Sequence, residues 1–489
     1  MSIIAPTVLV WFRNDLRLHD HEPLHRAWQS GLAIAAVYCY DPRQFDQTSQ
    51  GFAKTGAWRG HFLQQSVQNL AASLQSLGSQ LLVTTGLPEQ IIPEIASKIN
   101  AKTVYYHQEV TQEELDVERS LVKQLATLGI QAEGHWGSTL YHPEDLPFSI
   151  QDLPDLFTNF RKSVEKKKIP VRPCFPIPSQ LSPIPDIQFK LTPPPSEFFA
   201  VATTDARSVL AFQGGETAGL ARLKEYFWDG DRLKIYKETR NGMVGADYSS
   251  KFSPWLALGC LSPRFIYQEV KRYEQERISN DSTYWLIFEL LWRDFFRFVA
   301  QKYGDRLFNR GGLLGKRFPW QRDQVRFELW RSGQTGYPLV DANMRELNLT
   351  GFMSNRGRQN VASFLCKNLG IDWRWGAEWF ESCLIDYDVC SNWGNWNYTA
   401  GIGNDARDFR YFNIPKQSQQ YDPQGAYLRR WLPELKSLPG EKIHQPWLLS
   451  ATEQKQWGVR LGVDYPRPCV DFHQSLEARR KIEQAGDIC

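Results

Sequence analysis

The chain has 489 residues, of which 42% are hydrophobic and 23% are charged, and it contains 34 glycines and 28 prolines. This length predicts two or three domains, and this composition excludes disordered, collagenous and disulfide-scaffold proteins. The formal net charge of +3 is too small for the whole surface to attract nucleic acid.

Charge and tryptophan are concentrated in the second part of the chain. Residues 1–205 carry 17 Lys and Arg against 21 Asp and Glu, whereas residues 206–489 carry 40 against 33 and hold 14 of the 18 tryptophans. Basic side chains and flat rings are what a site for anions or planar ligands requires. We therefore expect any such site in residues 206–489.

The N-terminus and the cysteines indicate where the protein resides. The apolar run at residues 7–12 has no basic residue before it and follows Pro6, so it predicts a strand and not a signal peptide. No apolar run reaches the roughly 18 residues of a membrane span. The eight cysteines form no C-x-x-C pair, which favours buried thiols in a reducing compartment. We expect a cytoplasmic protein without a membrane anchor.

The first 140 residues predict an α/β domain. Apolar or β-branched runs alternate with helical patterns, and strands buried on both faces and separated by helices indicate a doubly wound parallel sheet. Such a sheet usually binds ligands beyond the carboxyl ends of its strands. No G-x-G-x-x-G follows the first strand, which disfavours nicotinamide binding. The expected strands are 7–12, 32–40, 80–86, 102–107 and 130–136, and the expected helices are 57–77, 88–99 and 111–128.

Residues 141–205 differ in composition from what precedes and follows them. They contain a basic run at 165–168 and nine prolines between positions 170 and 195. This composition predicts an extended linker between two domains. From residue 206 onward the hydrophobic periodicity is helical, so residues 206–489 are expected to form a mainly α-helical second domain.

One run in the second domain places a carboxylate among aromatic rings. In residues 284–298, Trp285, Glu289, Trp292 and Phe296 lie at helical offsets of three and four, and Arg293 follows Glu289 by four. The run is consistent with a buried core helix that carries a satisfied ion pair. It is also consistent with a carboxyl group whose pKa is raised by apolar surroundings, so that it donates a hydrogen bond.

Two further segments carry polar side chains next to apolar helices. Arg356 and Arg358 are either solvated or hold phosphate groups in a bidentate manner. Residues 386–398 combine acids, asparagines and tryptophans in a short span, which is typical either of a ligand site or of a tight turn. Residue spacing alone does not decide between these alternatives.

Taken together, these segments resemble the photolyase and cryptochrome superfamily, and within it the cryptochrome DASH branch. The resemblance covers nearly the whole chain, because W-F-R-N-D-L-R-L-H-D at residues 11–20 also fits. It implies an antenna domain of photolyase type at 1–140, a linker at 141–205 and a helical FAD-binding catalytic domain at 206–489. The matching motifs lie at residues 236–264, 289–297, 336–347, 354–360 and 385–398.

The resemblance implies a site for a folded-back FAD. Arg358 and Asp386 are expected to form an ion pair beside the flavin, with Asp388 at its pyrimidine edge. Asn392 is expected to face flavin N5, where an amide can donate or accept a hydrogen bond but cannot supply a proton as an acid does. The residues expected to hold the pyrophosphate and ribose are Tyr236, Ser249, Ser250, Lys251, Phe252 and Ser253.

Photolyases of this family use light and reduced FAD to repair cyclobutane pyrimidine dimers in DNA. Protonated Glu289 is expected to donate to a dimer carbonyl and to stabilise its radical anion. Tyr398 stands where enzymes that repair double-stranded DNA carry the second Trp of a W-x-W pair, which points to single-stranded or loop DNA. The residues expected to contact DNA are Glu289, Trp292, Asn355, Arg356 and Tyr398, with Arg240 and Arg293 as phosphate holders.

The resemblance also implies an electron-transfer chain and an antenna. The hopping tryptophans of the family correspond to Trp396, Trp373 and Trp320, although spacing alone would make each of them a core residue. A folate antenna, 5,10-methenyltetrahydrofolate, is expected between the domains, with Glu109 as a ligand.

Three functions compete at this point. The first is a monomeric photolyase that acts on dimers in single-stranded or loop DNA. The second is a blue-light photoreceptor or transcriptional regulator that signals through flavin photoreduction without repair. The third is an ordinary flavin oxidoreductase, which the missing nicotinamide fingerprint disfavours. The presence of Glu289, Trp292 and Asn392 favours repair, and the sequence leaves open whether signalling accompanies it.

Overall fold

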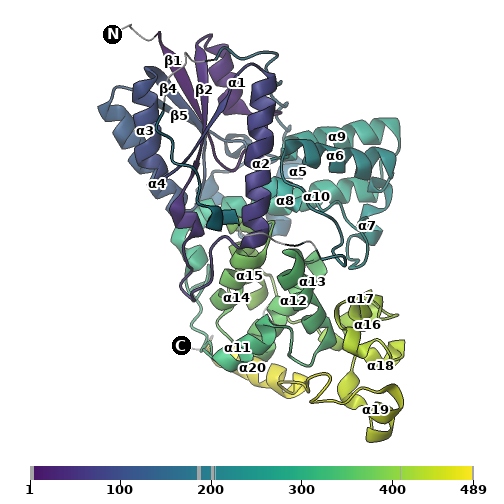
Figure 1. Ribbon diagram of the computed structural model, residues 1–489. Helices are drawn as coiled ribbons and strands as arrows, with labels where there is room; N and C mark the ends of the chain where they lie inside the picture. The colour runs from purple at the N-terminus through teal and green to yellow at the C-terminus, as the bar shows by residue number, and fades with distance from the viewer. Residues whose placement is uncertain (1–4, 184–188, 200–202, 204, 408, 487–489) are drawn as a thin grey trace.

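The computed structural model describes residues 5–183, 189–199, 203, 205–407 and 409–486. An α/β domain lies at one end of the molecule and a helical domain at the other (Figure 1). The α/β domain contains a five-stranded, fully parallel sheet with the strand order β3-β2-β1-β4-β5. Its strands are β1 (Thr7–Phe12), β2 (Ala33–Tyr40), β3 (Leu81–Thr85), β4 (Ala101–His107) and β5 (Gln131–His135).

The sheet confirms the five predicted strands, and helices cover both of its faces. One face packs with α3 and α4 through residues such as Ile92, Ile95 and Leu121. The other face packs with α1 and α2 through residues such as Leu24 and Phe62. Burial on both faces explains why the strands read as continuous apolar runs. The helices are α1 (Glu22–Gln29), α2 (Ala57–Ser76), α3 (Pro88–Lys98) and α4 (Gln112–Thr127).

The segment between the domains is only partly extended. Residues 157–167, which we expected to be extended linker, form a helix, α5 (Phe157–Lys167). Phe157, Phe160 and Val164 are buried on one side of this helix. Their offsets of three and four indicate a helix, but the nearby prolines favoured the prediction of an extended linker. Beyond α5 the described residues up to 199 run along the α/β domain, where Leu181 N donates to Leu77 O over 2.9 Å, and they include a short 3-10 helix, Ser196–Phe199.

The second domain is helical, as predicted. Its long helix α10 begins in a capping box in which Asn280 accepts from the backbone of Ser282 and Thr283. Among the residues that the structure describes, no helix is long and apolar enough to cross a membrane. The helices are α6 (Glu216–Lys224), α7 (Tyr236–Thr239), α8 (Ser253–Ala257), α9 (Pro263–Glu276), α10 (Asp281–Tyr303), α11 (Gln324–Arg331), α12 (Pro338–Thr350), α13 (Asn355–Ser363), α14 (Trp373–Cys383), α15 (Val389–Ala400), α16 (Ile414–Tyr421), α17 (Ala426–Trp431), α18 (Gly440–Ile443), α19 (Ala451–Trp457) and α20 (Phe472–Gly486).

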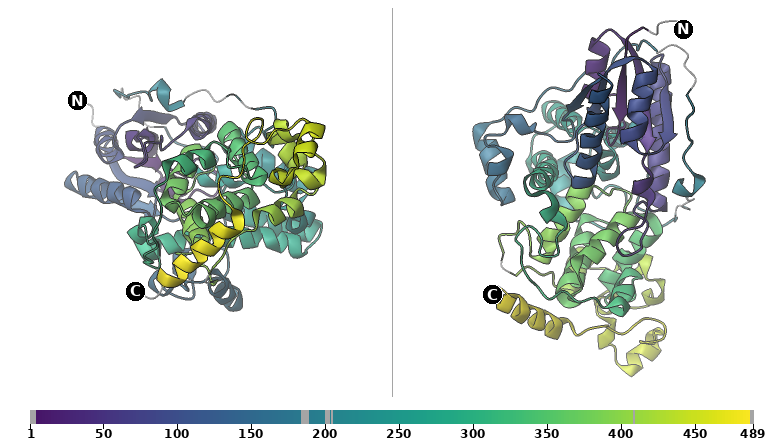
Figure 2. Two further views of the ribbon diagram at one scale, coloured as in Figure 1. Left: turned by 90° about the horizontal axis from the view of Figure 1, so that it is seen from below. Right: turned by 90° about the vertical axis from the view of Figure 1, so that its left-hand side faces the viewer.

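The C-terminal helix α20 lies across the end of the helical domain farthest from the sheet (Figures 1 and 2). A buried ion pair holds it there, because Lys367 Nζ lies 2.7 Å from Oε1 of Glu483. Lys367 belongs to a short π-helical segment, Phe364–Asn368, that follows α13. The last described turns of α20 are thus anchored to the segment that follows α13.

The helical domain fills the place where a ligand of the sheet would be expected. β1 lies between β2 and β4, so the direction of strand addition reverses between β1 and β4 and opens a crevice at their carboxyl ends. The backbone after β1 meets the loop after α8 there: Leu16 N donates to Leu258 O over 3.1 Å. Gly259 has a φ of +65°, and a Cβ at this position would overlap the Asn14 backbone. The crevice is therefore an interface between domains.

Helix α10 is fixed against the end of the α/β domain. The carboxylate of Asp294 is fully buried and accepts from Leu140 N and Tyr141 N over 2.9 and 3.0 Å. Burial raises the pKa of Asp294 to about 7, although the two backbone donors oppose this shift. This docking sets the position of the helix that carries Glu289 and Trp292.

Candidate functional site

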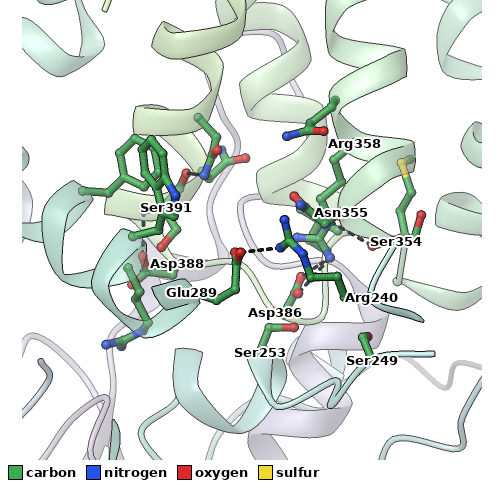
Figure 3. Close-up of a pocket in the computed structure, with 18 of the residues that line it drawn as sticks. Arg240, Ser249, Ser253, Glu289, Ser354, Asn355, Arg358, Asp386, Asp388 and Ser391 are labelled. Carbon is green, nitrogen blue, oxygen red and sulfur yellow. Dashed lines mark hydrogen bonds and ion pairs between the residues drawn. The ribbon is translucent and has the colours of Figure 1, made fainter. Parts of the chain in front are cut away.

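The helical domain encloses a cavity of about 430 Å³. Side chains from α7, α8, α10, α13, α14 and α15 line it, together with residues of the connecting segments 248–252, 352–354, 384–388 and 410–412 (Figure 3). Such a volume lies within the range of small-molecule and cofactor sites. The predicted residues that line it are Tyr236, Arg240, Ser249, Ser250, Lys251, Phe252, Ser253, Glu289, Trp292, Arg293, Asn355, Arg358, Asp386, Asp388, Asn392, Trp396 and Tyr398.

Lys251 supplies a buried positive charge at the edge of this cavity. The residue is 3% exposed, and its backbone has a φ of +57° in the left-handed region. Its Nζ has no hydrogen-bond partner in the protein and lies 3.2 Å from the ring centre of Tyr248. Burial and the nearby charge of Arg222 together lower the pKa of Lys251 to about 6, and Glu346 opposes this shift. A bound anion would satisfy this ammonium group.

Arg358 and Asp386 form the predicted ion pair at the cavity wall. Nη2 of Arg358 lies 2.8 and 3.0 Å from the two oxygens of Asp386, and Nε of Arg358 donates to Met353 O over 3.0 Å. Asp386 is buried and Arg358 is half-buried. The pair joins the start of α13 to the segment before α15 and holds both against the cavity (Figure 3).

Asp388 and Asn392 lie one helical turn apart at the start of α15. Asp388 caps the helix, because its Oδ1 accepts from Ser391 N over 2.7 Å. Arg293 and Arg297 lower the pKa of Asp388 against the opposing effect of burial. Asn392 is buried and its Nδ2 donates to Ala377 O over 3.0 Å, which leaves the amide oxygen as its free acceptor.

Glu289 forms an ion pair with Arg240 at the mouth of the cavity (Figure 3). Burial raises the pKa of Glu289, whereas Arg240 and the indole of Trp285 lower it. The side chain of Arg240 is 19% exposed and that of Glu289 is 28% exposed. The partner of Glu289 is therefore Arg240 of a distant segment and not Arg293, which the four-residue spacing favoured.

Two aromatic side chains line the mouth beside Glu289. The rings of Trp292 and Tyr398 are nearly perpendicular, at 81°, with centroids 5.8 Å apart. Trp292 also stacks on Phe157 of α5, with centroids 3.7 Å apart and an angle of 12°. The Tyr398 hydroxyl accepts from Nη2 of Arg410 over 2.7 Å. One wall of the mouth is therefore a tyrosine held in place by an arginine.

Two arginines predicted to hold DNA phosphates have other partners. Arg293 lines the cavity, but its guanidinium donates to the backbone carbonyls of Ser138 and Leu256, and burial lowers its pKa. This placement does not fit a phosphate contact. Arg356 does not line the cavity formed by the described residues. Its guanidinium donates to Asn241 Oδ1 over 3.0 Å and lies over the ring of Tyr421, because the side chain points away from the start of α13.

The three predicted hopping tryptophans run outward from the cavity. Trp396 is 2% exposed and lines the cavity from α15. Trp373 begins the facing helix α14 and is fully buried. The indole N–H groups of Trp373 and Trp320 donate to the same carbonyl, that of Arg310, over 3.1 and 3.2 Å. Trp320 is 4% exposed, because the guanidinium of Arg479 in α20 lies 4.1 Å from its ring centre.

A glycine on α14 makes room for Trp396, which leads to a first prediction. A Cβ at Gly376 would overlap Cη2 of Trp396 and Cδ2 of Leu365. Gly376→Ala should therefore displace the indole and lower the free energy of unfolding by about 1–3 kcal/mol. Urea unfolding followed by circular dichroism measures this change. Gly31→Ala serves as a control for the effect of a mere substitution, since a Cβ there meets nothing within 4 Å although its φ of +70° adds backbone strain. Equal loss in both variants would contradict the packing argument.

Glu109 lies at the interface between the domains and is 6% exposed. Its carboxylate forms an ion pair with Arg297 of α10, accepts from Asn14 Nδ2 over 3.3 Å and has a lowered pKa because of Arg297. Arg297 also lies 3.7 Å from Asp388. The carboxylate thus joins the end of β4 to the wall of the cavity. Its role as a folate ligand stays a prediction.

Sequence reasoning missed several residues that line the cavity, and two of them contact side chains that were predicted or lie next to them. Arg410 follows a glycine-rich turn and carries no motif, and only folding brings it to Tyr398. Tyr387 lies between Asp386 and Asp388, so the neighbouring acids were the more conspicuous residues. The hydroxyl of Tyr387 accepts from Nε1 of Trp393 over 3.2 Å. The density of rings in residues 386–398 was the available signal.

The side chains present fit a flavin nucleotide. An unpaired buried ammonium and short hydroxyl side chains at residues 249–253 suit a pyrophosphate. The ion pair of Arg358 with Asp386 and the amide of Asn392 suit the polar edge of a flat ring system. Aromatic and aliphatic side chains complete the wall.

Comparisons with known proteins agree with this chemistry. Residues 8–179 match the family described as DNA photolyase, and residues 285–484 match the FAD binding domain of DNA photolyase. Cryptochrome DASH of Synechocystis sp. is 86% identical over 488 residues, which cover 100% of both chains. The chain has a TM-score of 0.98 to the crystal structure of a Synechocystis cryptochrome, covering 99% of this chain and 100% of that chain at 86% identity. It has a TM-score of 0.87 to a class III photolyase of Agrobacterium tumefaciens, covering 100% and 99% at 31% identity. The chain belongs to the cryptochrome DASH branch of the photolyase and cryptochrome superfamily.

Proposed function

We propose that this protein binds FAD and uses blue light to repair cyclobutane pyrimidine dimers in single-stranded or loop DNA. The observation that carries the proposal is the position of Glu289 and Arg240. This ion pair and the touching rings of Trp292 and Tyr398 line the mouth of a cavity whose inner wall suits a flavin. Two linked pyrimidine bases taken out of a strand need such rings to pack against and such polar groups for their carbonyls.

In this proposal FAD, when bound, supplies light absorption and one-electron chemistry. Lys251 and the hydroxyl groups at residues 249–253 bind and orient its phosphates, and Arg358 and Asp386 fix the position of the ring. Asn392 offers an amide at the ring edge and therefore supplies no acidic proton. Buried side chains such as Trp396 exclude water from the inner wall.

The residues at the mouth act on the substrate. Glu289 in its protonated form donates to a carbonyl of the dimer, and Arg240 places a positive charge close to the same carbonyl. Both favour negative charge on the dimer, and electrostatic stabilisation of developing charge is usually a large term in catalysis. The raised pKa of Glu289 supports this role, because it increases the fraction of the protonated form near neutral pH.

We expect repair to be faster in single-stranded than in duplex oligonucleotides. Stacking of a base on an aromatic side chain contributes about 1–3 kcal/mol, and the perpendicular rings of Trp292 and Tyr398 do not form two parallel walls. Extraction of a dimer from a duplex costs a few kcal/mol, so we expect a rate advantage of about tenfold or more for single strands. Illumination of the purified protein with matched dimer-containing oligonucleotides measures it. Equal repair of both substrates would contradict the assigned mouth.

The alternative function is a photoreceptor that signals without repair. The buried tryptophans support it, because photoreduction requires hopping residues but no substrate at the mouth. The illumination experiment separates the two functions, since a receptor would show flavin photoreduction and leave dimers intact in both kinds of DNA.

Binding of FAD should take up a proton through Lys251. The free protein has a pKa of about 6 for this side chain, and phosphate oxygens nearby would raise that pKa toward the ordinary lysine value. Between these two pKa values the complex holds more protons than the free protein, so the affinity for FAD falls as pH rises above about 6. Calorimetry at roughly pH 7.5–8, which lies within this window, measures the proton uptake when it is repeated in buffers of different ionisation enthalpy. Lys251→Met should abolish it, and equal uptake in this variant would rule out Lys251.

A further inference from the structure

Trp373 has two aromatic neighbours that lead in different directions. Toward α20 it shares the Arg310 carbonyl with Trp320. Toward the α/β domain its ring meets the ring of Trp393 edge-on, with centroids 5.5 Å apart and an angle of 82°. Trp393 is 7% exposed and does not belong to the predicted hopping chain. The tryptophan chain therefore branches at Trp373.

A polar path continues from Trp393. Its Nε1 donates to the hydroxyl oxygen of Tyr387 over 3.2 Å, so the hydroxyl proton remains available for another acceptor. The carboxyl group of Glu381 is half-buried and interacts with this hydroxyl. Burial raises the pKa of Glu381 to about 7, although Arg59, Tyr387 and Lys54 oppose the shift. A carboxyl group with such a pKa can accept a proton near neutral pH.

Nearby charges favour different kinds of radical at the ends of the two branches, Trp320 and Tyr387. The Arg479 guanidinium lies 4.1 Å from the ring centre of Trp320, and a positive charge there disfavours removal of an electron from the indole. The Arg59 guanidinium lies 4.5 Å from the ring centre of Tyr387, and it equally disfavours a cation at that ring. A tyrosine that loses its proton together with the electron has a neutral ring, however, so no cation forms at the ring next to the Arg59 guanidinium.

We propose that Trp393, Tyr387 and Glu381 form a second electron-transfer branch that ends in a neutral tyrosyl radical. The inference rests on the proposed light-driven function. Bound FAD would supply the oxidant when it absorbs light. Trp396 then loses one electron, which Trp373 restores. Trp393 then gives one electron to oxidised Trp373, and Tyr387 gives one electron to oxidised Trp393. The phenol proton of Tyr387 moves to the Glu381 carboxylate. An external thiolate later gives one electron to the tyrosyl radical and becomes a thiyl radical, while Glu381 returns the proton to the tyrosyl oxygen.

This branch would prolong charge separation. Electron return to a tryptophan cation needs no proton, whereas electron return to a neutral tyrosyl radical requires its proton to come back from Glu381. Tyr387 and Glu381 lie where the α/β domain covers the helical domain, because Arg59 of α2 stacks on Tyr387. Tyr387 also lines the cavity, so the final radical forms where the cavity wall meets the α/β domain.

Electron paramagnetic resonance after a light flash tests the branch in the FAD-loaded, full-length protein. Protein grown with ring-deuterated tyrosine should give a radical spectrum narrower than that of unlabelled protein. Tyr387→Phe and Trp393→Phe should remove this tyrosyl component, and Glu381→Gln should lower its yield about tenfold. Tyr465→Phe is the matched control, because this buried tyrosine also donates to a buried carboxylate, that of Asp341, over 2.6 Å. It should leave the spectrum unchanged.

A second measurement tests the proton acceptor in the dark. Fluorine resonances of protein labelled with 3-fluorotyrosine are assigned to Tyr387 through the Tyr387→Phe variant. This resonance should shift with a midpoint near pH 7 as Glu381 titrates, and Glu381→Gln should abolish the shift. The charged groups that act on Glu381 are Arg59, Lys54 and Glu113. A resonance that shifts equally in Glu381→Gln would overturn the role of this carboxylate.

The outcomes distinguish the branch from the function on which it rests. Normal photoreduction with tryptophan radicals alone, insensitive to tyrosine deuteration, would overturn the branch and leave the proposed light-driven function standing. A tyrosyl signal that persists in Tyr387→Phe would overturn the assignment of this tyrosine. Loss of photoreduction in the wild type with FAD bound would overturn both the function and the branch.

Discussion

Trp396→Phe and Trp373→Phe should each lower the rate of flavin photoreduction by blue light and a thiol by about tenfold or more while FAD stays bound. Phenylalanine keeps most of the packing of an indole but is much harder to oxidise. Trp396 lines the cavity and Trp373 lies behind it on α14, so each is needed before the chain branches. Absorption spectroscopy under continuous blue light measures the rate, and the FAD content of the purified variants measures binding.

Trp431→Phe is the control for the loss of a buried indole. Trp431 is 1% exposed and lies in α17, with the Arg207 guanidinium over its ring. Its replacement should lower stability to a similar extent without changing photoreduction. Equal photoreduction in the wild type, Trp396→Phe and Trp373→Phe would make these side chains core residues without an electron-transfer role.

Glu289→Gln should lower dimer repair by about tenfold to a hundredfold and change DNA affinity by less than about threefold. Glutamine preserves the shape and an N–H donor, but it supplies no acidic proton and leaves Arg240 without its counter-charge. The change therefore acts on the charge that develops on the dimer more than on binding. Single-turnover repair and DNA binding, both measured with a single-stranded dimer-containing oligonucleotide, separate the two effects.

Glu269→Gln is the matched control for this substitution. The carboxylate of Glu269 accepts from Nε1 of Trp228 over 2.9 Å and lies 3.6 Å from the guanidinium of Arg272, so it has an arginine partner as Glu289 does. It lies on α9 and does not line the cavity. Repair should be normal in Glu269→Gln. Normal repair in Glu289→Gln as well would show that the assigned mouth does not hold the dimer.

The sequence by itself determined the layers of the molecule. All five predicted strands exist. The inner strands β2, β1 and β4 are buried on both faces and therefore carry apolar side chains at most positions. It also determined the helix that carries Glu289 and Trp292, because the periodicity of residues 284–298 is local. The motifs at 354–360 and 385–398 indicated which polar side chains would line the FAD cavity, and Arg358 and Asp386 do meet there.

Only the tertiary structure decided the partners of the charged side chains. Glu289 pairs with Arg240, 49 residues away in the chain, whereas Arg293 at the favoured spacing of four donates to two backbone carbonyls. Spacing along a helix shows which side chains can meet within that helix, but it does not show which distant segment packs closer. A buried cation takes the nearest acceptors that compensate for its lost hydration, and these acceptors come from other elements.

The aromatic surroundings of the site were likewise decided by packing. The proline-rich composition of residues 141–205 concealed a helix whose Phe157 stacks on Trp292, because proline content reports local backbone preference and not the burial of neighbouring rings. The contact between Trp373 and Trp393 joins two helices, α14 and α15, that cross in the core. Sequence periodicity identifies the buried side of each helix, whereas the pairs of rings that touch depend on how the two helices are placed against each other.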